Sequence, residues 1–136
     1  MTPEALLERA KAAMLRAYAP YSDFFVGAAL LTASGKVYEG CNIENAAYGP
    51  TNCAERTAFF KAVSEGERDF AAIAIVGGRH GEITQLTTPC GVCRQVMQEF
   101  CRPDFPIYLG GPGGTFETWT LSQLLPLGFP GKNQLK

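Results

Sequence analysis

Apolar residues recur at helical spacing near the start of the chain. Thr2-Pro3-Glu4 has the composition of a helix start, because proline fits the first turn and an acid suits the positive end of the helix dipole. Pro20 ends the run. The apolar positions between these signals are Leu6, Leu7, Ala10, Ala13, Met14, Ala17 and Tyr18. The other predicted helices span about 52–64, about 89–102 and 121–125.

Shorter apolar runs alternate with these helices and predict strands. Ser34-Gly35 is a turn signal that joins the first two runs into a hairpin, and Gly77-Gly78 is expected to break the third run, which has the composition of a central strand. The predicted strands are 24–32, 37–43, 70–76, 107–109 and 116–119. This order of helices and strands predicts a layered sheet flanked by helices, in a single domain spanning residues 1–136.

Composition and charge narrow the function classes. The chain has 136 residues, of which 46% are hydrophobic and 18% charged, as in globular proteins with a buried core. The net charge is -1 without a clustered excess of Lys and Arg, so we do not expect nucleic acid as a partner. Acids occur early in the chain, unlike in a secretory leader, and no apolar run approaches the roughly 20 residues that span a membrane. We therefore expect a cytoplasmic protein.

Three of the five cysteines have the spacing of metal ligands. Cys90 and Cys93 are separated by two residues, so both can reach one ion from a single turn, and Cys53 lies far upstream. Asn52-Cys53 and Pro89-Cys90 both fall where helices are predicted to begin, and the exposed N–H groups of a helix start stabilise thiolates. Thiolate ligands favour zinc among the common metals.

The role of this zinc depends on Glu55, which follows Cys53 by two residues in the same predicted turn. A catalytic zinc keeps three protein ligands and one open position, which a nearby unbound carboxylate can face. A closed structural site remains the alternative, with Cys41 or the single histidine, His80, as the fourth ligand. Cys41 and Cys101 are otherwise expected to pack as small buried side chains without chemistry.

Segments along nearly the whole chain resemble the cytidine deaminases of the short, homotetrameric, three-cysteine kind. The matching segments are Ala19-Pro20-Tyr21-Ser22, Phe25-Val26-Gly27-Ala28-Ala29, Gly40-Cys41-Asn42-Ile43-Glu44-Asn45-Ala46, Cys53-Ala54-Glu55-Arg56-Thr57-Ala58 and Pro89-Cys90-Gly91-Val92-Cys93-Arg94-Gln95. The resemblance implies a three-layer α-β-α sandwich with a mixed central sheet of about five strands. It also implies one zinc ion per subunit, and hydrolysis of cytidine and 2′-deoxycytidine to uridine and 2′-deoxyuridine plus ammonia in pyrimidine salvage.

The resemblance also assigns roles at the metal. Cys53, Cys90 and Cys93 would bind zinc, and Glu55 would take a proton from the attacking water and pass it to N3 of the pyrimidine. Three thiolates weaken the Lewis acidity of zinc, and Arg56 would offset this by hydrogen-bonding the ligand sulfurs.

Substrate contacts are expected elsewhere in the chain. Asn42 and Glu44 occupy alternate positions at the end of a predicted strand and so share one face, and an amide beside a carboxylate suits a hydroxyl group. The resemblance assigns this pair to the ribose 3′-hydroxyl, Phe24 to stacking on the base and Ala54 to backbone contacts with the pyrimidine edge. Tyr48 and Phe129 would complete the active sites of neighbouring subunits in a homotetramer.

Three other functions remain open. A related deaminase of a modified cytosine nucleoside or an aminonucleoside antibiotic would keep the zinc and Glu55 but change the residues that contact the sugar. A nucleic-acid-editing deaminase would need a basic groove, which the net charge of -1 disfavours. A non-catalytic zinc module would not need Glu55.

Overall fold

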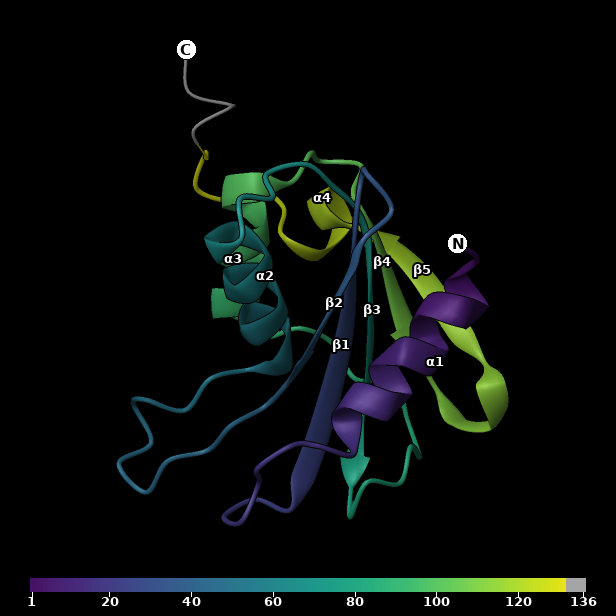
Figure 1. Ribbon diagram of the computed structural model, residues 1–136, viewed down its shortest axis with the longest axis vertical. Coiled ribbons are helices and arrows are strands. Elements are labelled where there is room, and N and C mark those ends of the chain that lie inside the picture. Colours follow the sequence, from purple (N-terminus) through teal and green to yellow (C-terminus); the bar gives the residue numbers. More distant parts are fainter. Residues whose placement is uncertain (132–136) are drawn as a thin grey trace.

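A five-stranded mixed sheet forms the centre of the structure (Figure 1). The computed structural model describes residues 1–131, so residues 132–136 of the predicted domain lie outside the described residues. The strand order is β2-β1-β3-β4-β5, with β3 and β4 parallel and the other neighbours antiparallel. The strands are β1 (Phe24–Thr32), β2 (Val37–Cys41), β3 (Phe70–Arg79), β4 (Pro106–Gly110) and β5 (Phe116–Thr120).

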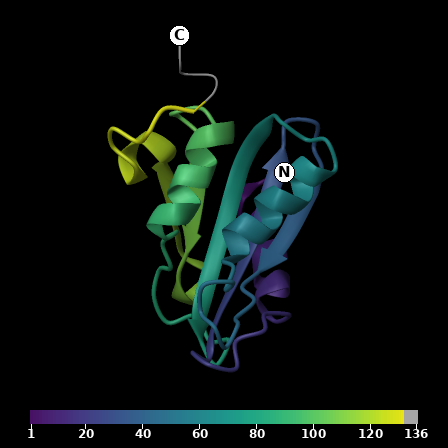
Figure 2. The same ribbon diagram turned by 90° about the vertical axis from the view of Figure 1, so that its left-hand side faces the viewer.

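Helices cover both faces of this sheet (Figure 2). The helices are α1 (Pro3–Met14), α2 (Ala54–Ser64), α3 (Gly91–Phe100) and α4 (Leu121–Leu124), with a short 3₁₀ turn η1 at Pro112–Gly114. The buried side of α1 packs on one face in a cluster that includes Leu6 and Val76, whereas α2, α3 and α4 pack on the other face around Phe59 and Met97. The expected three-layer α-β-α sandwich is therefore confirmed.

The first helix and the second strand are both shorter than predicted. The helix ends at Met14, and the N–H of its C-cap Leu15 donates to the carbonyl of Ala13. Tyr18 lies beyond the helix and forms an isolated bridge with Ile43, because its N–H donates to the Asn42 carbonyl. The predicted strand 37–43 ends at Cys41, so residues 42–44 follow the sheet as a separate bridged segment.

The prediction that Gly77-Gly78 breaks the third strand is wrong. Both glycines continue β3, opposite Val26 and Phe25 of β1. A Cβ atom at Gly78 would lie 1.7 Å from the Glu82 carbonyl oxygen. The glycines are thus explained by close packing of the backbone rather than by a turn.

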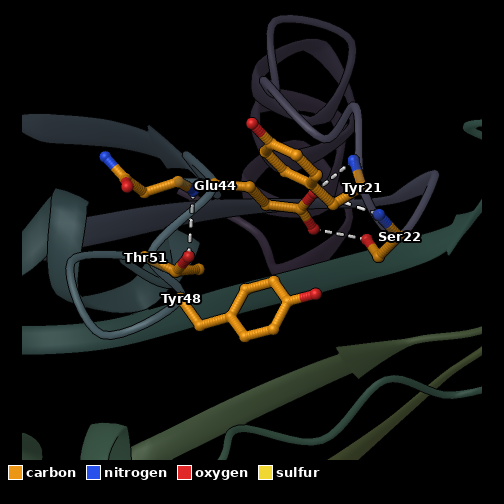
Figure 3. A pocket seen from close by; sticks show the side chains of 6 residues that line it. Tyr21, Ser22, Glu44, Tyr48 and Thr51 are labelled. Carbon is orange, nitrogen blue, oxygen red and sulfur yellow. Dashed lines mark hydrogen bonds between the residues drawn. The ribbon is translucent and has the colours of Figure 1, made fainter.

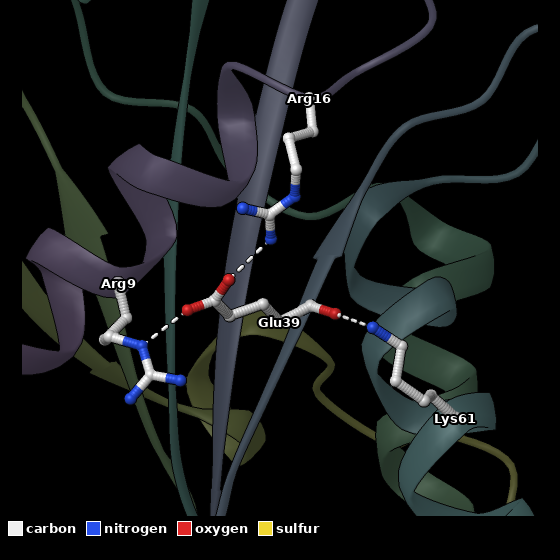
Figure 4. A network of polar contacts seen from close by, with 4 residues as sticks. All are labelled: Arg9, Arg16, Glu39 and Lys61. Carbon is white, nitrogen blue, oxygen red and sulfur yellow. Dashed lines mark hydrogen bonds and ion pairs between the residues drawn. The ribbon is translucent and has the colours of Figure 1, made fainter.

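Polar contacts fasten both helical layers to the edge strand β2 (Figure 4). The Glu39 carboxylate accepts from Arg9 of α1 and from Arg16 just beyond that helix, while Lys61 of α2 donates to the Glu39 carbonyl at 2.6 Å. Partial burial opposes ionisation of Glu39, but the two arginine contacts outweigh it and hold its pKa below the ordinary value. Charged groups along the edge also discourage pairing with another strand.

Candidate active site and metal centre

Two helix N-termini bring three cysteines together. Cys53 is the N-cap of α2, Cys90 is the N-cap of α3, and Cys93 lies in the first turn of α3. The Sγ atoms of Cys53 and Cys90 are 3.7 Å apart, those of Cys90 and Cys93 are 3.4 Å apart, and all three lie within 4.8 Å of one another. The cysteines are free rather than disulfide-bonded.

The donor set fits a tetrahedral zinc ion. A Zn–S bond of about 2.3 Å at the tetrahedral angle places two sulfurs roughly 3.8 Å apart, close to the observed separations. Within residues 1–131, neither Cys41 nor His80 joins this cluster, and His80 instead pairs with Asp23. The described part of the chain therefore supplies three ligands and leaves the fourth position for water or substrate, as catalytic zinc sites do.

Hydrogen bonds favour the thiolate form of Cys53. The hydrogen bond with Cys93 has the largest effect on its pKa, and the Arg56 guanidinium adds to it. Together these contacts outweigh partial burial and lower the pKa of Cys53 to about 5. Arg56 Nη2 donates to Cys53 Sγ at 3.2 Å, and the contact raises the pKa of Arg56 in turn. The Cys53 thiolate and burial raise the pKa of Cys93. Cys53 is therefore the readily ionised thiol, and a bound cation would favour loss of the proton from Cys93.

Glu55 is a buried acid beside this cluster. It lies in the first turn of α2 and is only 4% exposed. Burial raises its pKa to about 7, and the neighbouring Cys53 thiolate adds to the effect. A carboxyl group with such a pKa can both accept and donate a proton near neutral pH.

Glu44 lies in the wall of a pocket of about 340 Å³ (Figure 3). Its carboxylate accepts from the backbone N–H groups of Tyr21 and Ser22 and from the Ser22 hydroxyl. The Ser22 hydroxyl has the largest effect in lowering the pKa of Glu44 below its ordinary value. Tyr48 lines the same pocket with 75% of its surface exposed and has a positive φ of 65°.

Asn42 is oriented by two hydrogen bonds to β1. Its Oδ1 accepts from Val26 N–H at 2.9 Å, and its Nδ2 donates to the Phe24 carbonyl at 2.8 Å. Asn42 and Glu44 do not occupy alternate positions of a regular strand, as the sequence had suggested, because β2 ends at Cys41. Asn42 instead binds the start of β1, and Glu44 binds the segment just before it.

Of two other expected site residues, Ala54 is buried and Phe129 is exposed. Ala54 is fully buried as the first residue of α2, next to Cys53. Phe129 is 76% exposed and does not line the pocket that holds Glu44 and Tyr48. Within the described chain, its backbone is bound to Gln95 of α3, which donates to the Phe129 carbonyl at 3.0 Å and accepts from its N–H at 3.3 Å.

Sequence reasoning missed the roles of Ser22, Arg94 and Gln95 as supports, although all three fall in matched segments. Arg94 donates to the carbonyl of Pro89 at 2.7 Å and to that of Leu124 at 2.6 Å. It therefore links the irregular segment before Cys90 to the end of α4. The position of Arg94 and Gln95 directly after the Cys-x-x-Cys motif could have indicated a supporting role. Their partners, Leu124 and Phe129, lie about thirty residues away, so these contacts depend on the tertiary fold.

Comparison with known proteins identifies the family. A family described as the cytidine and deoxycytidylate deaminase zinc-binding region matches residues 1–109. The cytidine deaminase of Sporosarcina psychrophila is 53% identical over 129 residues, which cover 95% of this chain and 92% of that protein. The chain belongs to the zinc-dependent cytidine deaminase family. The family assignment makes the three-cysteine cluster its zinc site, with one zinc ion per subunit.

Other members of the cytidine deaminase family agree in sequence and in fold. The cytidine deaminase of Halalkalibacterium halodurans is 50% identical over 98% of each chain. The crystal structure of cytidine deaminase from Burkholderia pseudomallei superimposes with a TM-score of 0.88 at 52% identity, covering 95% of this chain and 100% of that one. None of the helices in residues 1–131 has the length and hydropathy needed to cross a membrane.

Proposed function

We propose that this chain hydrolyses cytidine and 2′-deoxycytidine to uridine and 2′-deoxyuridine, with release of ammonia. The observation that supports this most directly is the buried Glu55 beside a three-cysteine cluster that leaves a zinc ligand position open. A structural zinc site has no use for an unbound acid whose pKa is raised to about 7. Membership of the family gives the expected substrate class.

The protein residues divide the chemistry between metal binding and proton transfer. Cys53, Cys90 and Cys93 hold the zinc ion, which supplies the Lewis acidity that makes water nucleophilic near neutral pH. Glu55 accepts a proton from the attacking water and delivers it to N3 of the base, so that C4 becomes tetrahedral. Glu55 then takes the proton of the new C4 hydroxyl and passes it to the exocyclic nitrogen, so that the C4–N bond breaks, ammonia leaves and C4 becomes the carbonyl carbon of the product. Arg56 withdraws charge from Cys53 through its hydrogen bond.

The remaining hydrogen-bonding capacity of Asn42 and Glu44 suits a sugar hydroxyl. Asn42 uses one of its two amide hydrogens within the chain and has the other available for a hydroxyl oxygen. Glu44 accepts three hydrogen bonds, and its carboxylate can accept about one more, from a hydroxyl proton. Phe24 stacks on the base, and the backbone of Ala54 contacts the pyrimidine edge. A 3′-hydroxyl contact of this kind accepts ribose and 2′-deoxyribose alike.

The active enzyme is proposed to be a cytoplasmic homotetramer in which neighbouring subunits contribute Tyr48 and Phe129. Tyr48 and Phe129 are 75% and 76% exposed in the isolated chain, so both side chains are accessible to a neighbouring subunit, which supports this assignment. Analytical ultracentrifugation of the wild type and Phe129→Ala tests this assembly. A monomer with full activity would contradict it.

The function is tested by following the loss of cytidine absorbance with wild type and Glu55→Ala, each assayed for bound zinc. We expect wild type to form uridine, and the variant to keep its zinc and lose activity. The substrate panel includes deoxycytidine, 5-methylcytidine, an aminonucleoside antibiotic and a single-stranded oligonucleotide. Zinc binding with no turnover of cytidine or deoxycytidine would reject the proposal and leave a structural zinc or another amine substrate.

A further inference from the structure

His80, the only histidine in the chain, lies outside the metal cluster and forms a contact of its own. Its Nδ1 atom pairs with the Asp23 carboxylate, and its backbone N–H donates to the Asp23 carbonyl at 2.9 Å. Asp23 directly precedes β1 and His80 directly follows β3, where the register pairs Phe24 with Arg79. The Asp23–His80 pair therefore closes the end of the β1–β3 ladder beside Phe24.

Both residues of this pair have left-handed backbone conformations. The φ angles are 56° at Asp23 and 58° at His80, although neither residue is glycine. Such conformations are uncommon for residues with a Cβ atom, and they persist where surrounding contacts fix them. Here the contacts are the side-chain pair and the backbone hydrogen bond between the same two residues, so each contact supports the other.

The segment fixed by this pair leads directly to the proposed nucleoside site. Asp23 lies between Ser22, whose hydroxyl donates to Glu44, and Phe24, whose N–H donates to Ser22 Oγ at 3.0 Å. Asn42 binds the Phe24 carbonyl from the other side. Glu44 and Asn42, just after β2, thus hold one side of the segment, and His80, just after β3, holds the other.

We propose that the Asp23–His80 pair positions Phe24 and Ser22 for nucleoside binding. This inference rests on the proposed function, since Phe24 and Glu44 are assigned there to base and sugar. The side chains of His80 and Asp23 are 68% and 45% exposed, so the pair is screened by water and its effect is modest. The pair touches no reacting atom and acts on ground state and transition state alike, which affects KM rather than kcat.

The kinetic test uses His80→Asn, Asp23→Asn and the double variant, because asparagine tolerates the left-handed conformation and each change removes the contact between the imidazole and the carboxylate. We expect KM for cytidine to rise about three- to fivefold with kcat and zinc content unchanged. The double variant should be no worse than the more affected single variant, because both changes remove one interaction. Asp104→Asn is the matched control, since it breaks the exposed Arg102–Asp104 pair beyond the far end of α3 and should leave KM unchanged.

A second measurement does not depend on turnover. Amide hydrogen exchange of residues 22–25 should accelerate in His80→Asn and stay unchanged in Asp104→Asn. Unchanged exchange, or a lower kcat at constant KM, would overturn the positioning role. Wild type that turns over no nucleoside would reject the proposed function instead, and the exchange measurement would still decide whether the pair orders the segment.

Discussion

Replacing Glu55 by Gln preserves the size of the side chain and removes the carboxyl group that can transfer a proton. Because the proposed reaction passes successive protons through this one carboxyl group, kcat should fall by at least about 10²- to 10⁴-fold, the usual contribution of a general acid–base. Zinc content should not change, since the three sulfur ligands are untouched. Steady-state turnover of cytidine together with metal analysis measures both quantities.

The same substitution should stabilise the metal-free protein. Burial raises the pKa of Glu55 from 4.5 to about 7. At ~1.36 kcal/mol per pKa unit, this difference of about 2.5 units makes the ionised form of Glu55 in the folded protein unfavourable by about 3 kcal/mol. The sign follows from proton linkage: the folded state binds the proton more tightly than the unfolded state. The wild type therefore loses stability as pH rises from about 4.5 to 7, and the full loss is present above that range.

Scanning calorimetry of the metal-free proteins at about pH 5 and about pH 8 tests this reasoning. A change of 1 kcal/mol in stability shifts the melting temperature of a domain of this size by roughly 3 °C. The Tm of Glu55→Gln should therefore exceed that of wild type by up to about 10 °C at the higher pH and by much less at the lower pH. Glu99→Gln, a change at an exposed acid of α3, is the control, and its Tm should differ from that of wild type by the same small amount at both pH values. A Tm difference between Glu55→Gln and wild type that is equal at both pH values, or full activity of Glu55→Gln, would refute the account of Glu55.

Three further predictions concern the supports of the site and the fold. Arg56→Gln removes the charged donor to Cys53 and should weaken zinc binding about 10- to 100-fold, measured by competition with a chelator; unchanged affinity would contradict the role of the hydrogen bond. Glu39→Gln should cost about 0.5–1 kcal/mol in urea unfolding near neutral pH, and the difference should shrink as pH falls below 4.5 because the lowered pKa makes this stability depend on the carboxylate. Gly78→Ala should cost on the order of 2–3 kcal/mol because its Cβ would meet a carbonyl oxygen at 1.7 Å, whereas Gly49→Ala, with nothing within 4 Å, should be nearly neutral.

The metal cluster could be predicted from sequence because short-range geometry determines much of it. Cys90 and Cys93 are held within one turn by their spacing, and Cys53 and Glu55 share another helix start. Only the meeting of the two helix N-termini depends on tertiary structure, and the order of helices and strands already predicted a layered sheet. The confirmed three-layer fold brings both helices to the same face.

Contacts between segments distant in the chain were harder to predict. Gly77-Gly78 resembles a turn signal, and only the proximity of Glu82 and Thr87 explains two glycines inside a strand. The pairing of Gln95 with the backbone of Phe129 joins residues 34 positions apart, and no local pattern indicates it. The left-handed conformation of Asp23 likewise depends on its partner at the end of β3.

The proposed sugar contacts show how closely binding and folding are joined in this chain. Asn42 and Glu44 each make hydrogen bonds to the segment around β1, and each keeps unused capacity that suits a hydroxyl group. The internal bonds fix the direction of that remaining capacity, because an amide or a carboxylate that is already held has little freedom to rotate. Under the proposed function, binding a nucleoside would require little further ordering of these two side chains, which would reduce the entropic cost of recognition. Under the proposed function, the polar residues that hold the start of β1 would therefore also give the site its specificity.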